Sequence, residues 1–475
     1  MSHRAHGTMS LFTATCLVIS NMVGTGVFTS LGFQLLGGLT PFAILALWVV
    51  GGVCAFCGGV AYAELATALP RSGGEYHYLT RIFHPSVGFL AGWVSITAGF
   101  AAPVAAGAIA FAKYLRHVLL IMPDMTDLSV FSAEGPLALG YGSPAIAMSI
   151  AAARYGAEAL RFEHLASFVG LLAITAAMIA SPKLRQWFQN ASSSLTFLAI
   201  LVFLVLGFLA PAGGSSLAPQ AGDMQKVFSG GFATSLIYVM FAYAGWNAST
   251  YVAGEVCNPS RNVPLSMALG TVTVAIIYIA LNAIFLRVAP AAELKGQVEV
   301  GLIAGTHIFG AAGGKWMALI IAAGLLAHLG AMQWIGPRVS ATMGEDIRVM
   351  RPLAQVNAAG IPIYATLLQT AIAAFMIWNG SFDAVLTYVQ FTITLCSALV
   401  VLGVFVLRVR EPDLPRPVRA WGHPVTSGIF LAVNGWMLWH VLQAKPRESL
   451  AGLGTILLGL VIFYLSEWRG KKSKA

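Results

Sequence analysis

The stretch "SNMVGTGVFTS", residues 20–30, lies near the centre of the first long apolar segment of the chain. No Asp, Glu, Lys or Arg occurs between Arg4 and Glu64, which leaves room for two membrane spans of about 20 residues each. The quoted stretch nevertheless carries two glycines, one asparagine, two serines and two threonines. Such residues within a span indicate either tight helix packing or a helix that unwinds around a ligand.

The composition is that of a membrane protein that crosses the bilayer many times. Hydrophobic residues make up 58% of the chain, charged residues make up 9%, and the mean hydropathy is +0.79. In soluble proteins roughly a quarter of the residues are charged. No cleavable signal pattern precedes the first apolar segment, so we expect the first span to remain in the mature protein.

Uncharged runs of spanning length predict an all-α membrane protein with 12 transmembrane helices. The approximate ranges of these runs are 10–37, 41–69, 83–115, 165–181, 191–210, 229–254, 265–286, 316–337, 361–378, 384–407, 424–442 and 449–466. The apolar segment 144–153 is too short to span and is followed by four charged residues, so we expect it to form a helix in a long external loop.

The distribution of basic residues predicts the orientation of the chain. An even number of spans puts both termini on one side, and 17 of the 27 Lys and Arg residues fall on that side. Cytoplasmic loops carry the excess of Lys and Arg, so both termini are expected in the cytoplasm and the chain in the cytoplasmic (inner) membrane. Because the net charge of +9 is spread over short loops, it does not indicate a nucleic-acid partner.

Three interpretations of the glycines in the opening stretch can be compared. A dinucleotide fingerprint fails, because no strand precedes Gly24 and the third glycine is missing. Helix packing through small residues explains the glycines, but it does not explain Asn21, Thr25 and Thr29 beside them. A discontinuous helix explains both: the chain unwinds at Gly24 to Gly26 and frees backbone groups that line a cavity and meet a ligand.

A discontinuous first helix predicts a matching break in a second, inverted repeat. The sixth predicted span supplies it with "FAYAGWNASTYVAGE", residues 241–255, and Gly26 and Gly245 are 219 residues apart, close to the length of five spans. The whole chain, 1–475, is therefore expected to be one transporter domain with a five-plus-five inverted repeat. Its parts are repeat one at about 10–210, repeat two at about 229–407, and helices 11 and 12 at about 424–466.

Four motifs resemble those of the amino acid/polyamine/organocation (APC) superfamily, in particular bacterial amino acid permeases similar to the L-type amino acid transporters. They are "GTGVF" at 24–28, "YAELATALPRSGGEYHYL" at 62–79, "FAYAGWN" at 241–247 and "NPSRNVP" at 258–264. The resemblance implies the LeuT-like fold, with helices 1 and 6 discontinuous, and transport by alternating access.

The ends of the broken helices predict where an amino acid would bind. Unwinding exposes the N-terminus of an outer half-helix, whose N–H groups and partial positive charge suit a carboxylate; Thr25, Gly26 and Val27 are the expected cradle. Carbonyl groups at the other helix ends can accept hydrogen bonds from the ammonium group. These carbonyls are expected at Ile19, Ser20, Phe241, Ala242 and Ala244. By resemblance, Phe241 is the aromatic gate over the substrate, and Asn247 is a polar residue behind it.

Two positions bear on the driving ion. Many relatives hold a lysine on the fifth span in the place of a sodium ion. Aligning "FQNASSSLTFLAILVFLVLG", residues 188–207, with that span puts Thr196 at the lysine position. Sodium-coupled relatives need hydroxyl groups on the eighth span, and "GLLAHL" at 324–329 has none, so sodium coupling is not expected. His328 lies within that apolar span. It either carries a transported proton or stays neutral and forms a hydrogen bond across a helix interface.

The expected substrate is a neutral L-amino acid. The regions predicted to surround its side chain are 20–28, 98–106, 241–247, 326–334 and 388–394, and they contain no Asp or Glu. A cationic amino acid or polyamine exchanger of the same fold, or a non-transporting membrane sensor, is the alternative. A hydrolase motif and a channel filter are both missing from the sequence, and no cofactor or metal is expected.

The loop between the third and fourth spans bears on partner chains. Relatives that pair with a heavy chain do so through a cysteine in this loop, and residues 115–164 contain none. We therefore expect no disulfide-linked ancillary subunit.

Overall fold

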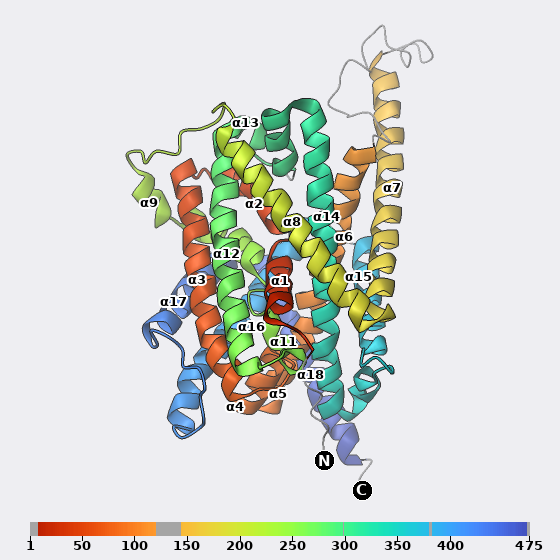
Figure 1. The fold of residues 1–475 in the computed structure, drawn as a ribbon, viewed down its shortest axis with the longest axis vertical. Helices are drawn as coiled ribbons and strands as arrows, with labels where there is room; N and C mark the ends of the chain where they lie inside the picture. The colour runs from red at the N-terminus through yellow and green to blue at the C-terminus, as the bar shows by residue number, and fades with distance from the viewer. Residues whose placement is uncertain (1–7, 120–143, 298, 380–381, 473–475) are drawn as a thin grey trace.

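The computed structural model describes residues 8–119, 144–297, 299–379 and 382–472 (Figure 1). Within these ranges the chain is helical, and its one β-bridge pairs Met9 with Val256. The first half contains α1 (Leu11–Met22), α2 (Thr25–Leu36), α3 (Pro41–Ala68), α4 (Glu75–Ile82), α5 (Pro85–Val94), a π-helix (Ser95–Phe100), α6 (Ala101–Leu119), α7 (Pro144–Ala180), α8 (Pro182–Leu209) and α9 (Asp223–Val227). The second half contains α10 (Gly230–Tyr243), α11 (Ala248–Tyr251), a 3-10 turn (Ala253–Glu255), α12 (Pro259–Val288), α13 (Ala291–Leu294), α14 (Val300–Asp346), a 3-10 helix (Arg348–Ala354), α15 (Ile363–Asn379), α16 (Phe382–Arg410), α17 (Val425–Ala444) and α18 (Pro446–Lys472).

Ten helical segments in the described ranges are long and apolar enough to cross a membrane, counting α1 with α2 and α5 with α6. The all-helical membrane architecture is therefore confirmed. Two of the 12 predicted spans, 229–254 and 361–378, correspond to the shorter apolar helices α10 and α15. The number of 12 spans and the five-plus-five repeat stay predictions.

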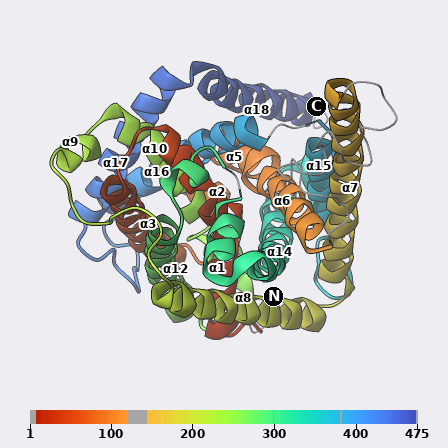
Figure 2. The same ribbon diagram turned by 90° about the horizontal axis from the view of Figure 1, so that it is seen from above.

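Helices α1 and α2 lie near the middle of the molecule, and α7, α8 and α18 lie at its edge (Figure 2). In the apolar window of α1 and α2, 76% of the residues are buried within the protein, against 28% in α8 and 22% in α18. The outer helices carry exposed leucines, valines and phenylalanines, which suits contact with lipid. The opening stretch of the sequence therefore lies where the protein itself surrounds it.

Three helices differ from the sequence prediction. Segment 144–153 is not a separate helix in a loop, because it continues without interruption into α7, which runs for 37 residues. The third span contains the π-helix Ser95–Phe100, where the hydroxyl groups of Ser95 and Thr97 bond to carbonyls one turn earlier. Helix α14 is interrupted at Gly310, whose φ of +71° lies in the left-handed region that favours glycine.

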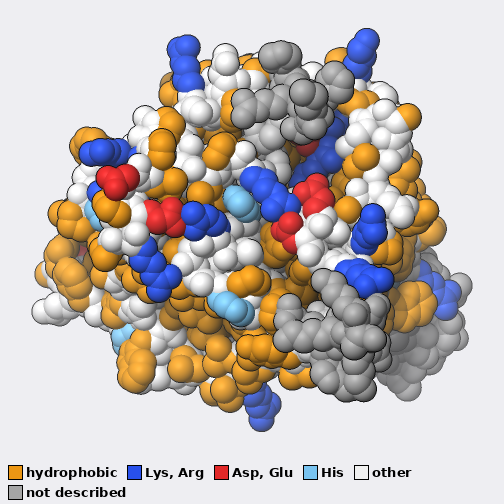
Figure 3. Space-filling view, turned by 90° about the horizontal axis from the view of Figure 1, so that it is seen from below, with side chains coloured by type: hydrophobic (Ala, Val, Ile, Leu, Met, Phe, Trp, Pro, Cys, Tyr) orange, Lys and Arg blue, Asp and Glu red, His pale blue; other side chains and the backbone are white. Residues whose placement is uncertain are grey.

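The end of the molecule at which the chain termini lie carries many of the charged side chains. Figure 3 shows Lys and Arg side chains over this end, with Asp and Glu among them. Ion pairs there join Arg71 to Glu345 and Asp346, and Arg81 to Glu411. This distribution is the one that the positive-inside rule requires of a cytoplasmic face, and the orientation itself stays a prediction.

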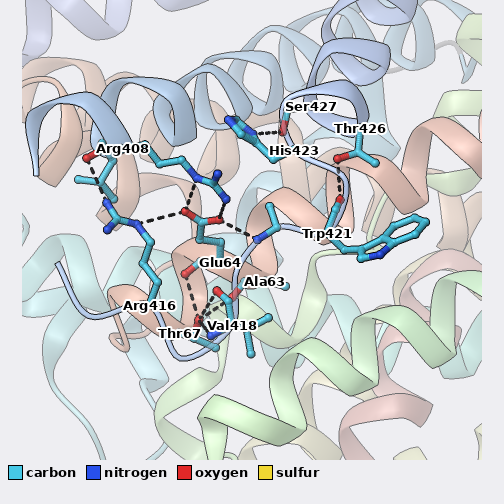
Figure 4. A network of polar contacts seen from close by, with 12 residues as sticks. Ala63, Glu64, Thr67, Arg408, Arg416, Val418, Trp421, His423, Thr426 and Ser427 are labelled. Carbon is cyan, nitrogen blue, oxygen red and sulfur yellow. Dashed lines mark hydrogen bonds and ion pairs between the residues drawn. The ribbon is translucent and has the colours of Figure 1, made fainter. Parts of the chain in front are cut away.

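Glu64 forms the most buried ion pair at this end (Figure 4). Its side chain is 1% exposed and receives two hydrogen bonds from Arg408 of α16, at 3.0 and 2.6 Å. Arg416 lies 3.2 Å from the same carboxylate, and the backbone N–H of Ala420 donates to it at 2.7 Å. Glu64 is therefore a paired residue, and it fixes the 411–424 connection against α3.

We predict that Glu64→Gln strongly destabilises the protein. Removing one partner of a buried ion pair leaves an unpaired charge, at a loss of about 3–5 kcal/mol. The matched control is Glu411→Gln, which breaks the ion pair with Arg81. The side chains of Arg81 and Glu411 are 47% and 31% exposed, so the loss of this pair should change the free energy of unfolding by about 1 kcal/mol or less. Thermal unfolding of both purified variants in detergent measures the difference. Equal melting temperatures would contradict the role given to Glu64.

Candidate functional site

The first helix break falls between α1 and α2. Helix α1 ends at Met22, Gly24 has φ −122° and ψ −148°, and α2 begins at Thr25. The break therefore consists of Val23 and Gly24, whereas the predicted break was residues 24–26. It begins one residue earlier and is one residue shorter, because Thr25 and Gly26 already belong to α2. A helix leaves its first N–H groups without intrahelical acceptors, and here these belong to Thr25, Gly26 and Val27.

The second break separates α10 from α11. Helix α10 ends at Tyr243, residues 244–247 form turns, and α11 begins at Ala248. Gly245 has φ +102°, a conformation that favours glycine. The side-chain amide of Asn21 donates to the carbonyl of Gly245 at 3.4 Å, so the two breaks touch.

Two further contacts hold the breaks together. An added Cβ on Gly26 would lie 2.7 Å from both Cα and Cβ of Ala242, so α2 approaches α10 as closely as a glycine allows. The hydroxyl of Tyr278 in α12 lies 2.6 Å from the carbonyl of Met22 and 3.0 Å from that of Ala242. Tyr278 thus binds the last turns of both α1 and α10, and it was not predicted from the sequence.

A cavity of about 950 Å³, part of it open to solvent, lies against both breaks. Six of the predicted residues line it: Gly26, Phe241, Ala242, Ala244, Asn247 and His328. The π-helix adds Ser95, Gly99 and Phe100 to the wall, as expected of a π-helix at a functional site. Three amide oxygens in the wall have no hydrogen-bond partner in the described part of the chain, and they belong to Asn21, Gln390 and Asn434. The cavity is therefore mainly apolar, with a few unpaired acceptors, as small-molecule sites are.

The remaining predicted residues lie elsewhere. Val27 is buried outside the cavity wall, and the side chain of Thr25 lies outside the described residues. Ile19, Ser20 and Thr196 line a second, smaller cavity behind α1. The assignment of Thr196 to the family's lysine position stays a prediction.

The second cavity is poor in oxygen ligands on the α14 side. Helix α14 contributes only Gly324 and Ala327 to its wall, and neither has a side-chain oxygen. The hydroxyl of Ser20 contacts that of Ser193, and the hydroxyl of Thr196 has no partner among the described residues. In the same ranges, no group of three or more His, Cys, Asp or Glu residues is placed to hold a metal ion.

His328 lies directly over the first break. Its Nδ1 donates to the carbonyl of Ser20 at 3.1 Å, so the ring satisfies a carbonyl at the end of α1. An added Cβ on Gly24 would lie 2.9 Å from the ring. One ring nitrogen is thus occupied by α1, and His328 also lines the main cavity.

Glu75 is the main residue of the wall that sequence reasoning placed elsewhere. It lies within the motif at 62–79, outside the regions that were predicted to surround the substrate, and α4 carries it into the cavity lining, 3% exposed. The premise that the wall contains no acid is therefore wrong. The two glycines before Glu75, both with positive φ, are the local signal of the turn that brings it inward.

Two broken helices that meet at one cavity in a helical membrane protein are typical of membrane transporters. A model of the amino acid permease family matches residues 9–461, so the chain belongs to that family, and the resemblance to APC-superfamily amino acid transporters is confirmed. Proteins of this family are transporters, not enzymes.

Three relatives illustrate the match. The b(0,+)-type amino acid transporter 1 of Mus musculus is 24% identical over 462 residues, 96% of this chain and 87% of that protein. The Asc-type amino acid transporter 1 of Mus musculus is 25% identical over 468 residues, 98% of this chain and 82% of the relative. The large neutral amino acids transporter small subunit 2 of Rattus norvegicus is 24% identical over 473 residues, with the same two shares.

We predict that Gly26→Val abolishes substrate binding and transport while the protein still inserts. The valine side chain would collide with Ala242 and disturb the N-terminus of α2. Gly435→Val is the matched control, because an added Cβ there meets nothing within 4 Å. Uptake by proteoliposomes that contain equal amounts of each variant is the measurement. Unchanged affinity in Gly26→Val would exclude the α2 N-terminus as the carboxylate site.

Proposed function

We propose that this permease is a secondary active transporter that carries neutral L-amino acids across the cytoplasmic membrane by alternating access. The observation that carries the proposal is the meeting of the two helix breaks at one cavity. Free N–H groups at one break and carbonyl oxygens at the other offer both partners that an α-amino acid needs. The relatives' names, which include a transporter of large neutral amino acids, support the same class of substrate.

The carboxylate is proposed to bind the N–H groups of Thr25, Gly26 and Val27. A helix N-terminus contributes about 0.3–1 kcal/mol through its dipole, in addition to the hydrogen bonds. The ammonium group is proposed to bind on the α10 side, at the carbonyls of Phe241, Ala242 and Ala244. Phe241 covers the substrate as the gate, with Asn247 behind it.

The carbonyls of Ile19 and Ser20 are less suited to the ammonium group. Both residues line the second cavity and not the main one, whereas Phe241, Ala242 and Ala244 line the main cavity. The α10 side is therefore the principal ammonium site in this proposal.

The presence of Glu75 in the wall favours a second candidate, a transporter of cationic amino acids. If Glu75 is ionised, a cationic side chain would be its counter-ion. If Glu75 is neutral, a cationic side chain would bring an unpaired charge into the cavity. This would weaken the binding free energy by about 3–5 kcal/mol, which lowers the affinity by a factor of about 100 or more.

Competition for uptake distinguishes the two candidates. We expect leucine, alanine and valine to compete strongly for uptake by the purified chain in proteoliposomes, with arginine and lysine at least about 100-fold weaker. Neutral substrates that differ by one methylene should differ by only about 1–3 kcal/mol. Arginine or lysine competing as well as leucine would overturn the neutral assignment.

Activity that appears only after a second chain is added would contradict the proposal that no disulfide-linked subunit is needed.

Transport should not depend on sodium. The second cavity has no side-chain oxygen on its α14 side, so a sodium ion there would lack part of its ligand set. Replacing sodium with choline in the uptake buffer should leave the rate unchanged, with a proton gradient held constant. A loss of uptake in choline, restored by sodium, would contradict this proposal.

A chain that binds amino acids but transports none would be a sensor.

A further inference from the structure

Glu75 is the only carboxylate among the described residues that line the main cavity. Its Oε1 accepts hydrogen bonds from the hydroxyl of Tyr62 at 2.6 Å, the hydroxyl of Ser397 at 2.8 Å and the amide of Asn247 at 3.5 Å. These donors come from α3, from α16 and from the second helix break. The carboxylate is thus held in a defined position by three separate parts of the chain.

Glu75 differs from the paired acids at this end of the molecule because the described residues provide it with no cation. Glu64, Glu255, Asp346 and Glu411 each form an ion pair with at least one arginine. A carboxylate buried without a counter-ion is strongly disfavoured, so it either takes up a proton or binds a cationic ligand.

The titratable groups that face Glu75 are neutral at physiological pH. They are the hydroxyls of Tyr62 on α3, Tyr78 on α4 and Tyr251 on α11, and the thiol of Cys396 on α16. His328 is the other titratable group that lines the cavity. Burial raises the pKa of Glu75, and the donors Tyr62 and Ser397 oppose part of this rise.

The second oxygen of Glu75, Oε2, is available for a proton. No hydrogen bond from the described residues reaches it, whereas Oε1 accepts three. A carboxylic acid with its proton on Oε2 would therefore keep every contact of Oε1. It would also present an O–H donor in a residue that lines the cavity.

Asn247 connects this carboxylate to the proposed substrate site. It lies in the break between α10 and α11, and its amide donates to Tyr251 at 3.1 Å as well as to Glu75. A change in the charge of Glu75 therefore acts on the segment that is proposed to hold the substrate.

We propose that Glu75 is the proton-binding site of this transporter and that one proton moves inward with each amino acid. This inference rests on the proposed function and extends it to the driving ion. A proton from the external water forms the O–H bond on Oε2 while the site is closed to the cytoplasm. When the site opens inward, water solvates the carboxylate, the O–H bond breaks and the proton passes to cytoplasmic water.

Glu75→Gln tests the proposal, because glutamine imitates the neutral acid and cannot release a proton. The purified chain is placed in proteoliposomes with a pH dye inside, and the probe is an equimolar mixture of labelled L-amino acids. With one proton per substrate, a gradient of one pH unit supports about tenfold accumulation. We expect the wild type to accumulate label and acidify the interior, and Glu75→Gln to exchange label without either effect.

Two controls separate this role from a structural one. Glu293→Gln changes an exposed pair with His307 and should keep the proton movement of the wild type. Ser397→Ala removes a donor that stabilises the ionised form, so the pKa of Glu75 should rise and the pH at which uptake declines should move upward. This shift keeps the proposal testable even if Glu75→Gln fails to fold.

Several results would overturn the proposal. If Glu75→Gln keeps proton entry and loses only the exchange of lysine and arginine, Glu75 is the counter-ion of a cationic substrate. If His328→Gln loses proton entry and retains exchange, while Glu75→Gln keeps proton entry, the proton belongs to His328. Wild-type exchange without accumulation would reject proton coupling and leave the proposed function intact. No exchange by the wild type would reject both.

Discussion

The contact between the two helix breaks constrains the rest of the molecule. Gly26 meets the backbone of Ala242 so closely that no side chain fits, and Asn21 donates to the carbonyl of Gly245. The Tyr278 hydroxyl binds the last turns of both α1 and α10. Backbone groups freed within a membrane protein must find partners inside the protein. The surrounding helices supply those partners and leave a cavity where some groups stay free.

Glu64 and Glu255, two acids away from the cavity, form ion pairs. Glu64 has two arginines and a backbone N–H, and Glu255 is paired with Arg185 and Arg338. At the cavity, the first N–H groups of α2 have no acceptor within their own helix and no side-chain cap, and Oε2 of Glu75 receives no hydrogen bond from the described residues. These free donors and acceptors could be satisfied by a zwitterion and a proton.

The sequence predicted the breaks well because glycines beside polar residues in an apolar run are a local signal. Gly24 and Gly245 both lie at the observed breaks, and the residues around them line the cavity. Glu75 could not be placed in the same way, because its position depends on how α4 packs against α3 and α16. Tyr278 gave no local signal either, since a tyrosine in an apolar helix is common. Helix α7 was divided wrongly because its charged residues interrupt the apolar pattern without ending the helix.

A structure of the chain in lipid nanodiscs with bound leucine, determined by electron cryo-microscopy, tests the central claim most directly. The account predicts density for the amino acid between the N-terminus of α2 and the end of α10. The carboxylate should lie within hydrogen-bond distance of the N–H groups of Gly26 and Val27, and the ammonium should face the carbonyls of residues 241–244. Leucine bound in another cavity, or in the reverse orientation at this one, would contradict it.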